Sequence, residues 1–271
     1  MYPILQKKKL AENTYMMEIE APEVAKKAKP GQFIILRIDE KGERIPLTIA
    51  DSTKKTIIMV FLVVGKTTEE LSLLKKGDSL IDFVGPLGIP SKLQEYGHVV
   101  LIGGGLGIAP IYPVAKALKK LNNRITVIMG AKSKKYLFWE DHFKDICDKV
   151  LIATDDGSKG SKGFVSNVLN EVIRKEKIDL VIAMGPPIMM KTIADMTRSR
   201  IKTICSLNPI MVDGMGMCGG CRIMVDDEVK FACCDGPEFN AHKVDWDEFM
   251  NRNKTYIDEE SKCKAGKCSK K

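Results

Sequence analysis

The chain has 271 residues, of which 44% are hydrophobic and 29% charged, and its formal net charge is +8 at pH 7. This length suffices for one large or two medium domains with a sizeable core, and the composition is ordinary for a soluble globular protein. No apolar run is long enough to span a membrane, and the N-terminus lacks the basic-then-apolar pattern of a signal peptide. We therefore expect a cytoplasmic protein with no membrane partner.

The excess positive charge is concentrated at the C-terminus. Residues 261–271 carry five lysines and no acidic residue, whereas the other basic residues are scattered among carboxylates. No basic stripe is interleaved with aromatic side chains, so we expect no nucleic-acid partner. Residues 261–271 are predicted to be a solvated basic tail.

Residues 1–97 consist of short β-type runs separated by turns. The runs alternate in polarity or are rich in β-branched residues, and they cover residues 14–21, 31–39, 56–65 and 79–88. One short helix is predicted in TTEELSLL, with Thr67 as its cap and Glu70 three residues later completing a capping box. Strands at this spacing predict a small antiparallel β-barrel.

Residues 98–206 alternate β and α patterns. The apolar strands lie in HVVLIGGG, RITVIMGAKS, KVLIATDDGS and DLVIAMGPP, and each is followed by a polar loop and helical periodicity. This alternation predicts a doubly wound parallel sheet. Ligands of such sheets bind at the carboxyl ends of the strands, where three polar or glycine-rich loops fall.

The first of these loops, GGGLGIAP, follows a strand and opens a helix. Glycines there let the backbone approach a pyrophosphate, and the helix N-terminus supplies N–H groups. The loop departs from the G-x-G-x-x-G pattern because Ala109 and Pro110 stand where the last glycine would be. A tight turn between strand and helix remains the alternative.

The second loop, TDDGSKGSKG, offers two carboxylates for ribose hydroxyls. Asp155 and Asp156 would repel a 2′-phosphate and so favour NAD(H), although turn formation is the alternative role of such aspartates. Three lysines in the preceding loop, Lys132, Lys134 and Lys135, favour NADP(H) instead. The choice between NAD(H) and NADP(H) therefore stays open.

In the barrel segment, RIPLTIAD brings Arg44 and Thr48 to one strand. An arginine can clamp a pyrophosphate, and a hydroxyl can hydrogen-bond a flavin ring nitrogen or carbonyl. An exposed surface arginine is the alternative. The predicted helix start after Gly65, at Thr67 and Thr68, is a further candidate anion site.

Residues 207–260 are rich in glycine and cysteine, with little periodicity, which suggests that a metal or cluster stabilises them. Eight cysteines in a cytosolic chain are unlike a disulfide framework, and Cys147 and Cys205 have the apolar surroundings of core residues. A zinc site would need a second Cys-x-x-Cys or Cys-His pair, and His242 has no such companion. A redox dithiol is disfavoured because further cysteines lie nearby.

A resemblance connects these motifs. The order RIPLTIA, VVGKTTEEL, GPLG, IGGGLGIAPI, TDDGSKGSKGFV and AMGPPIMM resembles the ferredoxin–NADP⁺ reductase superfamily. Within it, GMCGGC followed by CCDGPEF resembles the electron-transfer subunits, above all the small subunits of NADH-dependent reduced ferredoxin:NADP⁺ oxidoreductases, also known as sulfide dehydrogenases. The electron-transfer subunits of dihydroorotate dehydrogenase are close cousins. The resemblance covers about residues 1–260.

The resemblance implies three parts: an FAD-binding β-barrel domain (1–97), an NAD(P)-binding α/β domain (98–206) and a [2Fe-2S] cluster module (207–260). Thr48 would be the catalytic residue at the flavin. The implied flavin-binding residues are Arg44, Pro46, Leu47 and Thr48, with Gly65, Thr67 and Thr68 near the pyrophosphate. The implied nicotinamide-nucleotide residues are Gly103, Gly104, Gly105, Gly107, Asp155, Asp156, Gly157, Gly185, Pro186 and Pro187.

The cluster ligands follow the plant-type spacing Cys-x4-Cys-x2-Cys with a later fourth cysteine. If Cys218 and Cys221 are the second and third ligands, the first position is occupied by Asp213. The family pattern, one residue and then Asp-Gly-Pro, selects Cys233 over Cys234 as the distal ligand. In the dihydroorotate cousins a cysteine stands at the first position. The alternative for Asp213 is a turn residue, with Cys234 or water as the fourth ligand.

The expected function is an enzyme subunit that oxidises NADH at FAD and passes single electrons through the [2Fe-2S] cluster. The expected partner is a larger iron–sulfur flavoprotein in a heterodimer, and the whole complex would be a ferredoxin:NAD(P)⁺ oxidoreductase, with electron bifurcation as one mode. The alternatives are a dihydroorotate dehydrogenase electron-transfer subunit and a redox-sensing module that reports NAD(H) poise. Cys263 and Cys268 lie outside the family pattern.

Overall fold

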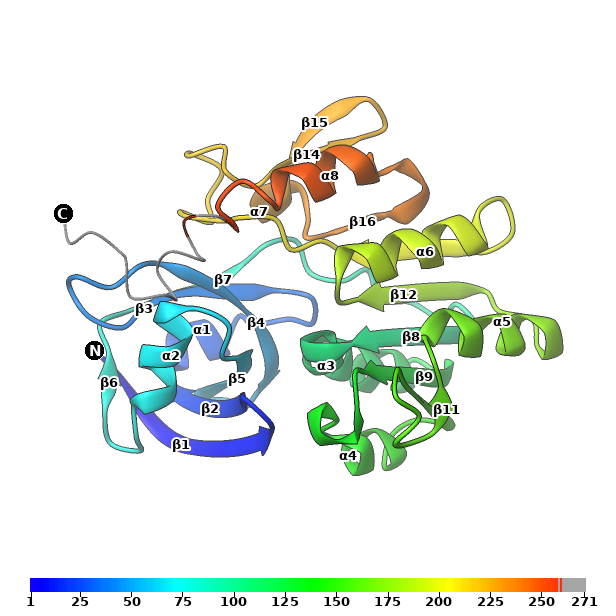
Figure 1. The fold of residues 1–271 in the computed structure, drawn as a ribbon. Helices are drawn as coiled ribbons and strands as arrows, with labels where there is room; N and C mark the ends of the chain where they lie inside the picture. Colours follow the sequence, from blue (N-terminus) through cyan, green and yellow to red (C-terminus); the bar gives the residue numbers. More distant parts are fainter. Residues whose placement is uncertain (258, 260–271) are drawn as a thin grey trace.

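The computed structural model describes residues 1–257 and 259, and its elements are shown in Figure 1. The predicted tail with Cys263 and Cys268 therefore lies outside the described residues. Two seven-stranded sheets organise the chain, one built from the N-terminal strands and one from the central and C-terminal strands. In the described part of the chain, no helix combines the length and apolarity that crossing a membrane requires.

The first sheet is the predicted antiparallel barrel. Its strand order is β6-β1-β2-β5-β4-β3-β7, and only Ile81 separates β6 from β7, so the two edges of the sheet meet. The elements of this part are β1 (Tyr2–Ala11), β2 (Thr14–Glu20), α1 (Pro22–Ala25), β3 (Phe33–Arg37), β4 (Ile45–Ser52), β5 (Thr56–Leu62), α2 (Lys66–Leu73), β6 (Ser79–Leu80) and β7 (Asp82–Leu87). Alternating apolar residues such as Met17, Ile19, Ile57 and Met59 fill its interior.

The predicted cap of α2 is wrong. The helix begins at Lys66 with Gly65 as its N-cap, so the cap lies two residues earlier than the sequence pattern indicates. Thr68 is then the third helical residue, and its hydroxyl accepts hydrogen bonds from the backbone N–H groups of Val64 and Gly65, both at 3.0 Å. A threonine at this position can take the role that Glu or Gln has in a capping box, which the choice of Thr67 as cap overlooked.

The second sheet is the predicted doubly wound sheet, with one addition. Its order is β11-β10-β9-β8-β12-β13-β16, and β16 runs antiparallel to β13 while every other pair is parallel. Its strands are β8 (His98–Gly104), β9 (Arg124–Ala131), β10 (Lys149–Thr154), β11 (Ser161–Lys162), β12 (Leu180–Met184), β13 (Lys202–Ser206) and β16 (Glu238–Asn240). Helices cover both faces: α3 (Ile108–Lys119) and α4 (Glu140–Lys144) one, α5 (Val165–Lys175) and α6 (Pro187–Thr197) the other.

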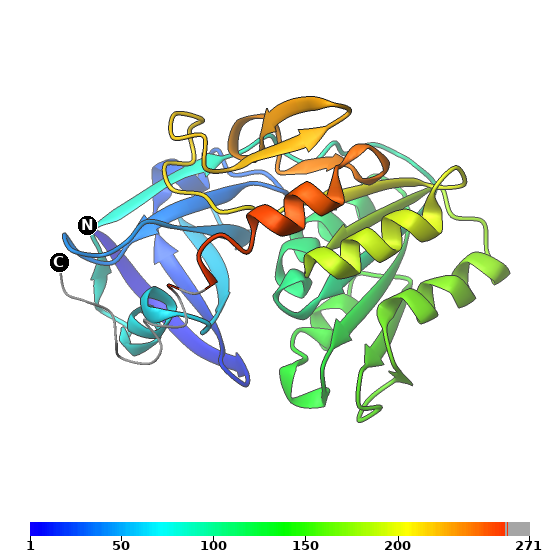
Figure 2. The ribbon, with the colours of Figure 1, turned by 45° about the horizontal axis from the view of Figure 1, so that its top comes forward.

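The remaining C-terminal segment packs on the α5 and α6 side of this sheet. It contains β14 (Arg222–Val225), β15 (Glu228–Phe231), α7 (Ala232–Asp235), the 3₁₀ turn η3 (Ala241–Lys243) and α8 (Trp246–Arg252). Two further 3₁₀ turns, η1 (Gly105–Gly107) and η2 (Lys134–Tyr136), lie in the second sheet's part of the chain. Trp246 and Phe249 are buried in the same core as Ile193 of α6. Figures 1 and 2 both show α8 beside α6. The segment thus shares an apolar core that its weak periodicity did not indicate.

Candidate functional site

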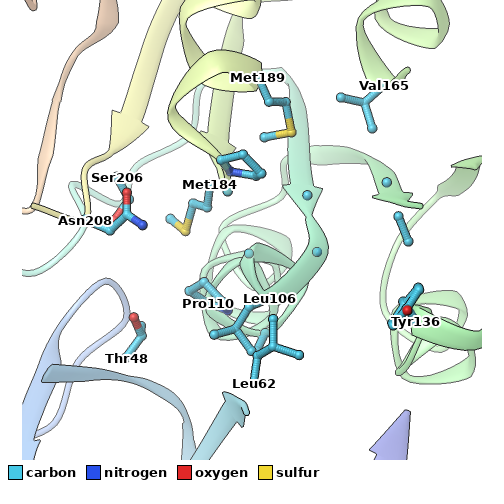
Figure 3. Close-up of a pocket in the computed structure, with 18 of the residues that line it drawn as sticks. Thr48, Leu62, Leu106, Pro110, Tyr136, Val165, Met184, Met189, Ser206 and Asn208 are labelled. Carbon is cyan, nitrogen blue, oxygen red and sulfur yellow. The ribbon is translucent and has the colours of Figure 1, made fainter. Parts of the chain in front are cut away.

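A cavity of about 1070 Å³ lies where the barrel meets the carboxyl ends of the parallel strands. Figure 3 shows Thr48 on the barrel side, Met184 and Asn208 on the side of the second sheet, and Leu106 and Pro110 from the glycine-rich turn. The volume slightly exceeds the range of about 300–1,000 Å³ that is usual for one small ligand. The cavity therefore has room for more than one ligand moiety.

The barrel wall of the cavity comes from four neighbouring strands, β2, β5, β4 and β3. Thr48 on β4 pairs in register with Phe33 on β3, and both line the cavity. Pro46 and Leu47 line it as well, as predicted, whereas Arg44 is exposed and is not among the lining residues. The strand thus presents one hydroxyl in a mostly apolar wall.

The N-terminal turn of α2 lies outside the cavity lining. Neither Gly65, Thr67 nor Thr68 lines it. The hydroxyl of Thr67 donates a hydrogen bond to the carboxylate of Glu43 at 2.9 Å, so one of the chain's own anions already meets this turn. The hydroxyl of Thr68 is used in capping.

The glycine-rich turn combines close packing with exposed backbone. A Cβ on Gly107 would lie 2.0 Å from the carbonyl oxygen of Met184, so this glycine permits close packing of the turn on β12. Gly103 and Gly104 are similarly confined. Gly105, in contrast, has a φ of +56°, meets nothing within 4 Å of a built Cβ, and lines the cavity. Backbone at Gly105 is therefore open to a ligand.

The two aspartates after β10 differ in their surroundings. Asp155 lines the cavity, whereas the carboxylate of Asp156 accepts hydrogen bonds from the hydroxyl and backbone N–H of Ser158, at 2.6 and 2.9 Å. These bonds lower the pKa of Asp156. Neither Asp156 nor Gly157 lines the cavity, so the turn interpretation fits Asp156 and the ligand interpretation fits Asp155.

The loop after β9 and the loop after β12 complete the nucleotide side. Lys132 lines the cavity, and Lys135 is ion-paired with Glu12 at 2.9 Å. Gly185 and Pro186 line the cavity, while Pro187 begins α6 and does not.

Sequence reasoning missed the wall that follows β13. Ser206, Leu207, Asn208, Pro209 and Met211 all line the cavity, and Pro237 joins them. These residues carry no motif, but they follow the carboxyl end of a strand in a parallel sheet, which was the available signal. Met211 stands two residues before Asp213, and Pro237 stands four residues after Cys233, so the cavity wall is adjacent in sequence to two candidate cluster ligands.

The four predicted cluster residues form two pairs. The Sγ atoms of Cys221 and Cys233 are 3.1 Å apart, and both residues are buried. The carboxylate of Asp213 accepts hydrogen bonds from the backbone N–H groups of Met215 (2.7 Å) and Cys218 (2.5 Å). These bonds, with a further one from the Cys218 thiol, lower the pKa of Asp213. In the described part of the chain, no three His, Cys, Asp or Glu side chains converge as a metal-ion site.

The donor chemistry of these pairs fits an iron–sulfur cluster. Thiolates are the usual cluster ligands, and the four residues together offer three thiols and one carboxylate, the number of protein ligands that a two-iron cluster takes. Cys234 is exposed, and its sulfur lies 3.6 Å from that of Cys233 and 2.7 Å from a Cβ built on Gly216. Cys205 is buried, and burial raises the pKa of its thiol; burial also raises the pKa of Cys147 to about 12.

Comparison with known proteins defines the class of this molecule. The family model of the oxidoreductase NAD-binding domain matches residues 101–195, and that of the iron-sulfur cluster binding domain of dihydroorotate dehydrogenase B matches residues 208–245. With the barrel beside them, these domains define an oxidoreductase subunit for electron transfer, and the expected cofactor set of FAD, an iron–sulfur cluster and NAD(H) is confirmed at the level of domains.

Full-length relatives define the family. The chain is 52% identical over 260 residues to a dihydroorotate dehydrogenase B electron transfer subunit homolog of Thermotoga maritima, covering 95% of this chain and 92% of the relative. It is 35% identical to the dihydroorotate dehydrogenase B electron transfer subunit of Desulforamulus reducens, covering 88% and 95%. The chain belongs to this family of electron transfer subunits.

A solved structure shows the same fold along nearly the whole chain. A chain of an NADH-dependent reduced ferredoxin-NADP oxidoreductase superposes with a TM-score of 0.93 at 49% sequence identity, and the match covers 98% of this chain and 97% of the other. The expected relationship to both groups of electron-transfer subunits is confirmed.

Proposed function

We propose that this chain oxidises NADH in the cavity and passes single electrons to a larger iron–sulfur flavoprotein subunit, in a cytoplasmic ferredoxin:NAD(P)⁺ oxidoreductase. One observation carries the proposal: a single cavity is lined by the barrel, by the glycine-rich turn and by the chain just before Asp213. When bound, FAD accepts an electron pair as hydride whereas an iron–sulfur cluster takes electrons singly, so together they convert a two-electron donor into a one-electron source.

On the barrel side, Pro46, Leu47 and Thr48 would hold the flavin ring, with the Thr48 hydroxyl as a hydrogen-bond donor and the apolar wall excluding water. Phe33 adds aromatic surface beside Thr48. Arg44, which is exposed and outside the cavity lining, would contact the pyrophosphate by turning its side chain toward it. Thr67 and Thr68 would approach the pyrophosphate through their backbone N–H groups, because their hydroxyls are already engaged. Gly65 would lie near the pyrophosphate as the N-cap of α2, with its own N–H bonded to the Thr68 hydroxyl.

On the nucleotide side, the open backbone at Gly105 and the N-terminus of α3 would receive the phosphates of NAD(H). Gly103, Gly104 and Gly107 shape the turn. Asp155 would accept hydrogen bonds from a ribose, while Asp156 and Gly157 hold the loop. The backbone of the Gly185-Pro186-Pro187 turn would close the nicotinamide end.

The cluster would be a [2Fe-2S] cluster held by Asp213, Cys218, Cys221 and Cys233. The 3.1 Å separation of the Cys221 and Cys233 sulfurs supports this assignment, and the hydrogen bond from the backbone N–H of Cys218 holds the Asp213 carboxylate at the same loop. The approach of the Cys233 sulfur to the Cys221 sulfur favours Cys233 over Cys234 as the distal ligand. Asp213 also favours the ferredoxin-NADP oxidoreductase group, because the resemblance implies a cysteine at this position in the dihydroorotate group.

The test uses the full-length chain reconstituted with FAD, iron and sulfide. We expect NADH to reduce a one-electron artificial acceptor, and a Thr48→Val variant to lose rate while Thr48→Ser retains it, because one neutral hydrogen bond contributes about 1 kcal/mol, roughly fivefold. A chain that binds FAD and NADH yet never reduces the acceptor would support the redox-sensing module instead.

The partner is tested separately. Co-purification with a flavoprotein subunit that carries further iron–sulfur clusters, followed by NADH- and NADP⁺-dependent ferredoxin turnover, supports the proposed complex. Co-purification with a dihydroorotate-oxidising subunit would identify the alternative, which the family membership favours as the second candidate.

A further inference from the structure

The last residue of α8 reaches the cluster loop. The guanidinium of Arg252 donates a hydrogen bond from Nη2 to the carbonyl oxygen of Gly220 at 3.2 Å. Gly220 stands between Cys218 and Cys221, which are two of the candidate ligands. Helix α8 therefore contacts the loop at its centre, from a position about 30 residues further along the chain.

This helix is firmly placed. Its first turn is capped by Asp245, whose carboxylate accepts hydrogen bonds from the backbone N–H groups of Asp247 and Glu248. Trp246 and Phe249 are buried in the core shared with α6, and the indole N–H of Trp246 donates to the carbonyl of Ala241 at 3.0 Å. Arg252 is consequently presented by a packed helix rather than by a loose terminus.

The hydrogen bonding of the ion pair between Arg252 and Glu248 is incomplete. Its Nε lies 3.6 Å from Oε1 of Glu248, and the two side chains are only 27% and 29% exposed. Arg252 Nε and Glu248 Oε2 are both buried without a hydrogen-bond partner among the described residues. A buried guanidinium with an unused donor is costly unless a nearby negative group compensates it.

We propose that Arg252 is a positioning residue that holds the Cys218–Cys221 loop and raises the reduction potential of the cluster bound there, and that Glu248 opposes this effect. The proposal rests on the proposed function, specifically on the cluster ligands. Reduction adds one negative charge to the cluster, and a half-buried cation beside the loop stabilises that charge. Glu248 partly neutralises the cation.

The hydrogen bond also orients the loop. The C=O and N–H of one peptide unit point in opposite directions, so anchoring the Gly220 carbonyl to Arg252 directs the Cys221 N–H to the other side of the same peptide. The Gly220 N–H lies 3.4 Å from the Cys218 sulfur. Loss of the anchor should therefore loosen the arrangement of N–H groups around the candidate ligands as well as remove a charge.

The experiment is a redox titration of the full-length chain, followed by EPR of the reduced cluster and by iron and sulfide content. We expect Arg252→Gln to shift the midpoint to a more negative potential and to lose cluster faster. The equilibrium constant for reduction of the cluster should fall several-fold. A tenfold change in this constant corresponds to about 59 mV in the midpoint potential of a one-electron couple. Glu248→Gln should shift the midpoint to a more positive potential. Arg252→Lys, which keeps charge without the fork geometry, should lie between Arg252→Gln and the parent chain.

Arg222 supplies the matched control, because it is an exposed arginine directly after Cys221. Arg222→Gln should move the midpoint little, since solvent screens it. Equal midpoints and equal cluster loss in Arg252→Gln and the parent chain would overturn the proposal. If Arg252→Gln retains no cluster, the Glu248→Gln variant becomes the decisive test. A midpoint potential of Glu248→Gln that equals that of the parent chain, or is more negative, also overturns the proposal. Failure of the parent chain to bind any cluster would instead refute the proposed function.

Discussion

The ammonium group of Lys116 on α3 donates to both carboxylate oxygens of Asp51 on β4, at 3.0 and 2.7 Å. The pair joins the second sheet's helical layer to the barrel beside the cavity. Lys116 and Asp51 are 34% and 25% exposed, so solvent screens the interaction only in part. The contribution of this ion pair to the free energy of unfolding should therefore be large enough to measure.

We expect Asp51→Asn and Lys116→Gln each to lower the free energy of unfolding by about 1 kcal/mol, and their double mutant to show that the losses are coupled. Urea unfolding at low and high salt measures the coupling, which should shrink at high salt. The pair Glu23–Lys26, 78% and 62% exposed, is the control and should couple weakly. A coupling between Asp51 and Lys116 no larger than that control would contradict the prediction.

Asp213 has two candidate roles that mutation can separate. As a ligand, Asp213→Cys should keep the cluster but change its EPR spectrum and midpoint potential, because thiolate is softer than carboxylate. As a turn residue alone, Asp213→Asn should retain the cluster with the parent spectrum and midpoint, since the amide oxygen still accepts one of the two backbone N–H groups that the carboxylate accepts.

The control for this test is Asp235→Asn. Asp235 also accepts a backbone N–H in the same region, from Phe231 at 2.7 Å, but is not a candidate ligand. We expect no spectral change in it. An Asp213→Asn chain with the parent spectrum and midpoint would remove Asp213 from the ligand set.

Nucleotide preference should depend on Asp155 and hardly on Asp156. Asp155 lines the cavity, where its charge would repel a 2′-phosphate, whereas Asp156 is hydrogen-bonded to Ser158. Asp155→Asn should raise the ratio of kcat/KM for NADPH to that for NADH by about fivefold, corresponding to about 1 kcal/mol. Asp156→Asn serves as the control, and equal ratios in the two variants would refute the assignment.

Stability should fall with rising pH because of Glu238. The carboxyl group of Glu238, the first residue of β16, accepts a hydrogen bond from the Ser91 hydroxyl at 2.5 Å, and burial raises its pKa. A carboxyl whose pKa is higher in the folded than in the unfolded state binds more protons when folded. The free energy of unfolding is therefore greatest below the unfolded pKa of about 4.3, falls as pH rises from there, and levels off above the folded pKa.

Glu238→Gln should abolish this slope, as urea unfolding between pH 4 and pH 8 would show. The Ser91 hydrogen bond lowers the pKa of Glu238, so Ser91→Ala should raise that pKa and extend the slope to higher pH. A slope that persists unchanged in Glu238→Gln would show that another group is responsible.

The sequence predicted elements whose signals are local. Strands β8, β9, β10 and β12 have unbroken apolar runs followed by glycine or polar loops, and all four are present. In contrast, β1 was missed, because its lysine-rich middle resembles a surface segment although Ile4 is fully buried beneath it. Tertiary pairing with β2 and β6 overrides that local pattern.

The residues of the candidate site show the same difference between local sequence signals and tertiary contacts. Pro46, Leu47, Thr48, Gly105 and Asp155 were found from motifs and line the cavity. Asn208 and Met211 were missed since no motif marks them, and their place depends on β13 ending beside β12. Arg252 was missed because its contact with Gly220 joins segments 32 residues apart. Contacts of this kind follow from packing, which sequence patterns do not encode locally.

The pairing of β13 with β16 has a consequence for synthesis of the chain. Until Glu238–Asn240 has been made, the backbone N–H and C=O groups along one side of β13 have no strand to pair with. A nascent or truncated chain that stops before residue 238 would therefore display an open strand edge next to a largely formed nucleotide-binding sheet. The segment that carries the candidate cluster ligands thus protects the enzyme's own sheet from association with other chains.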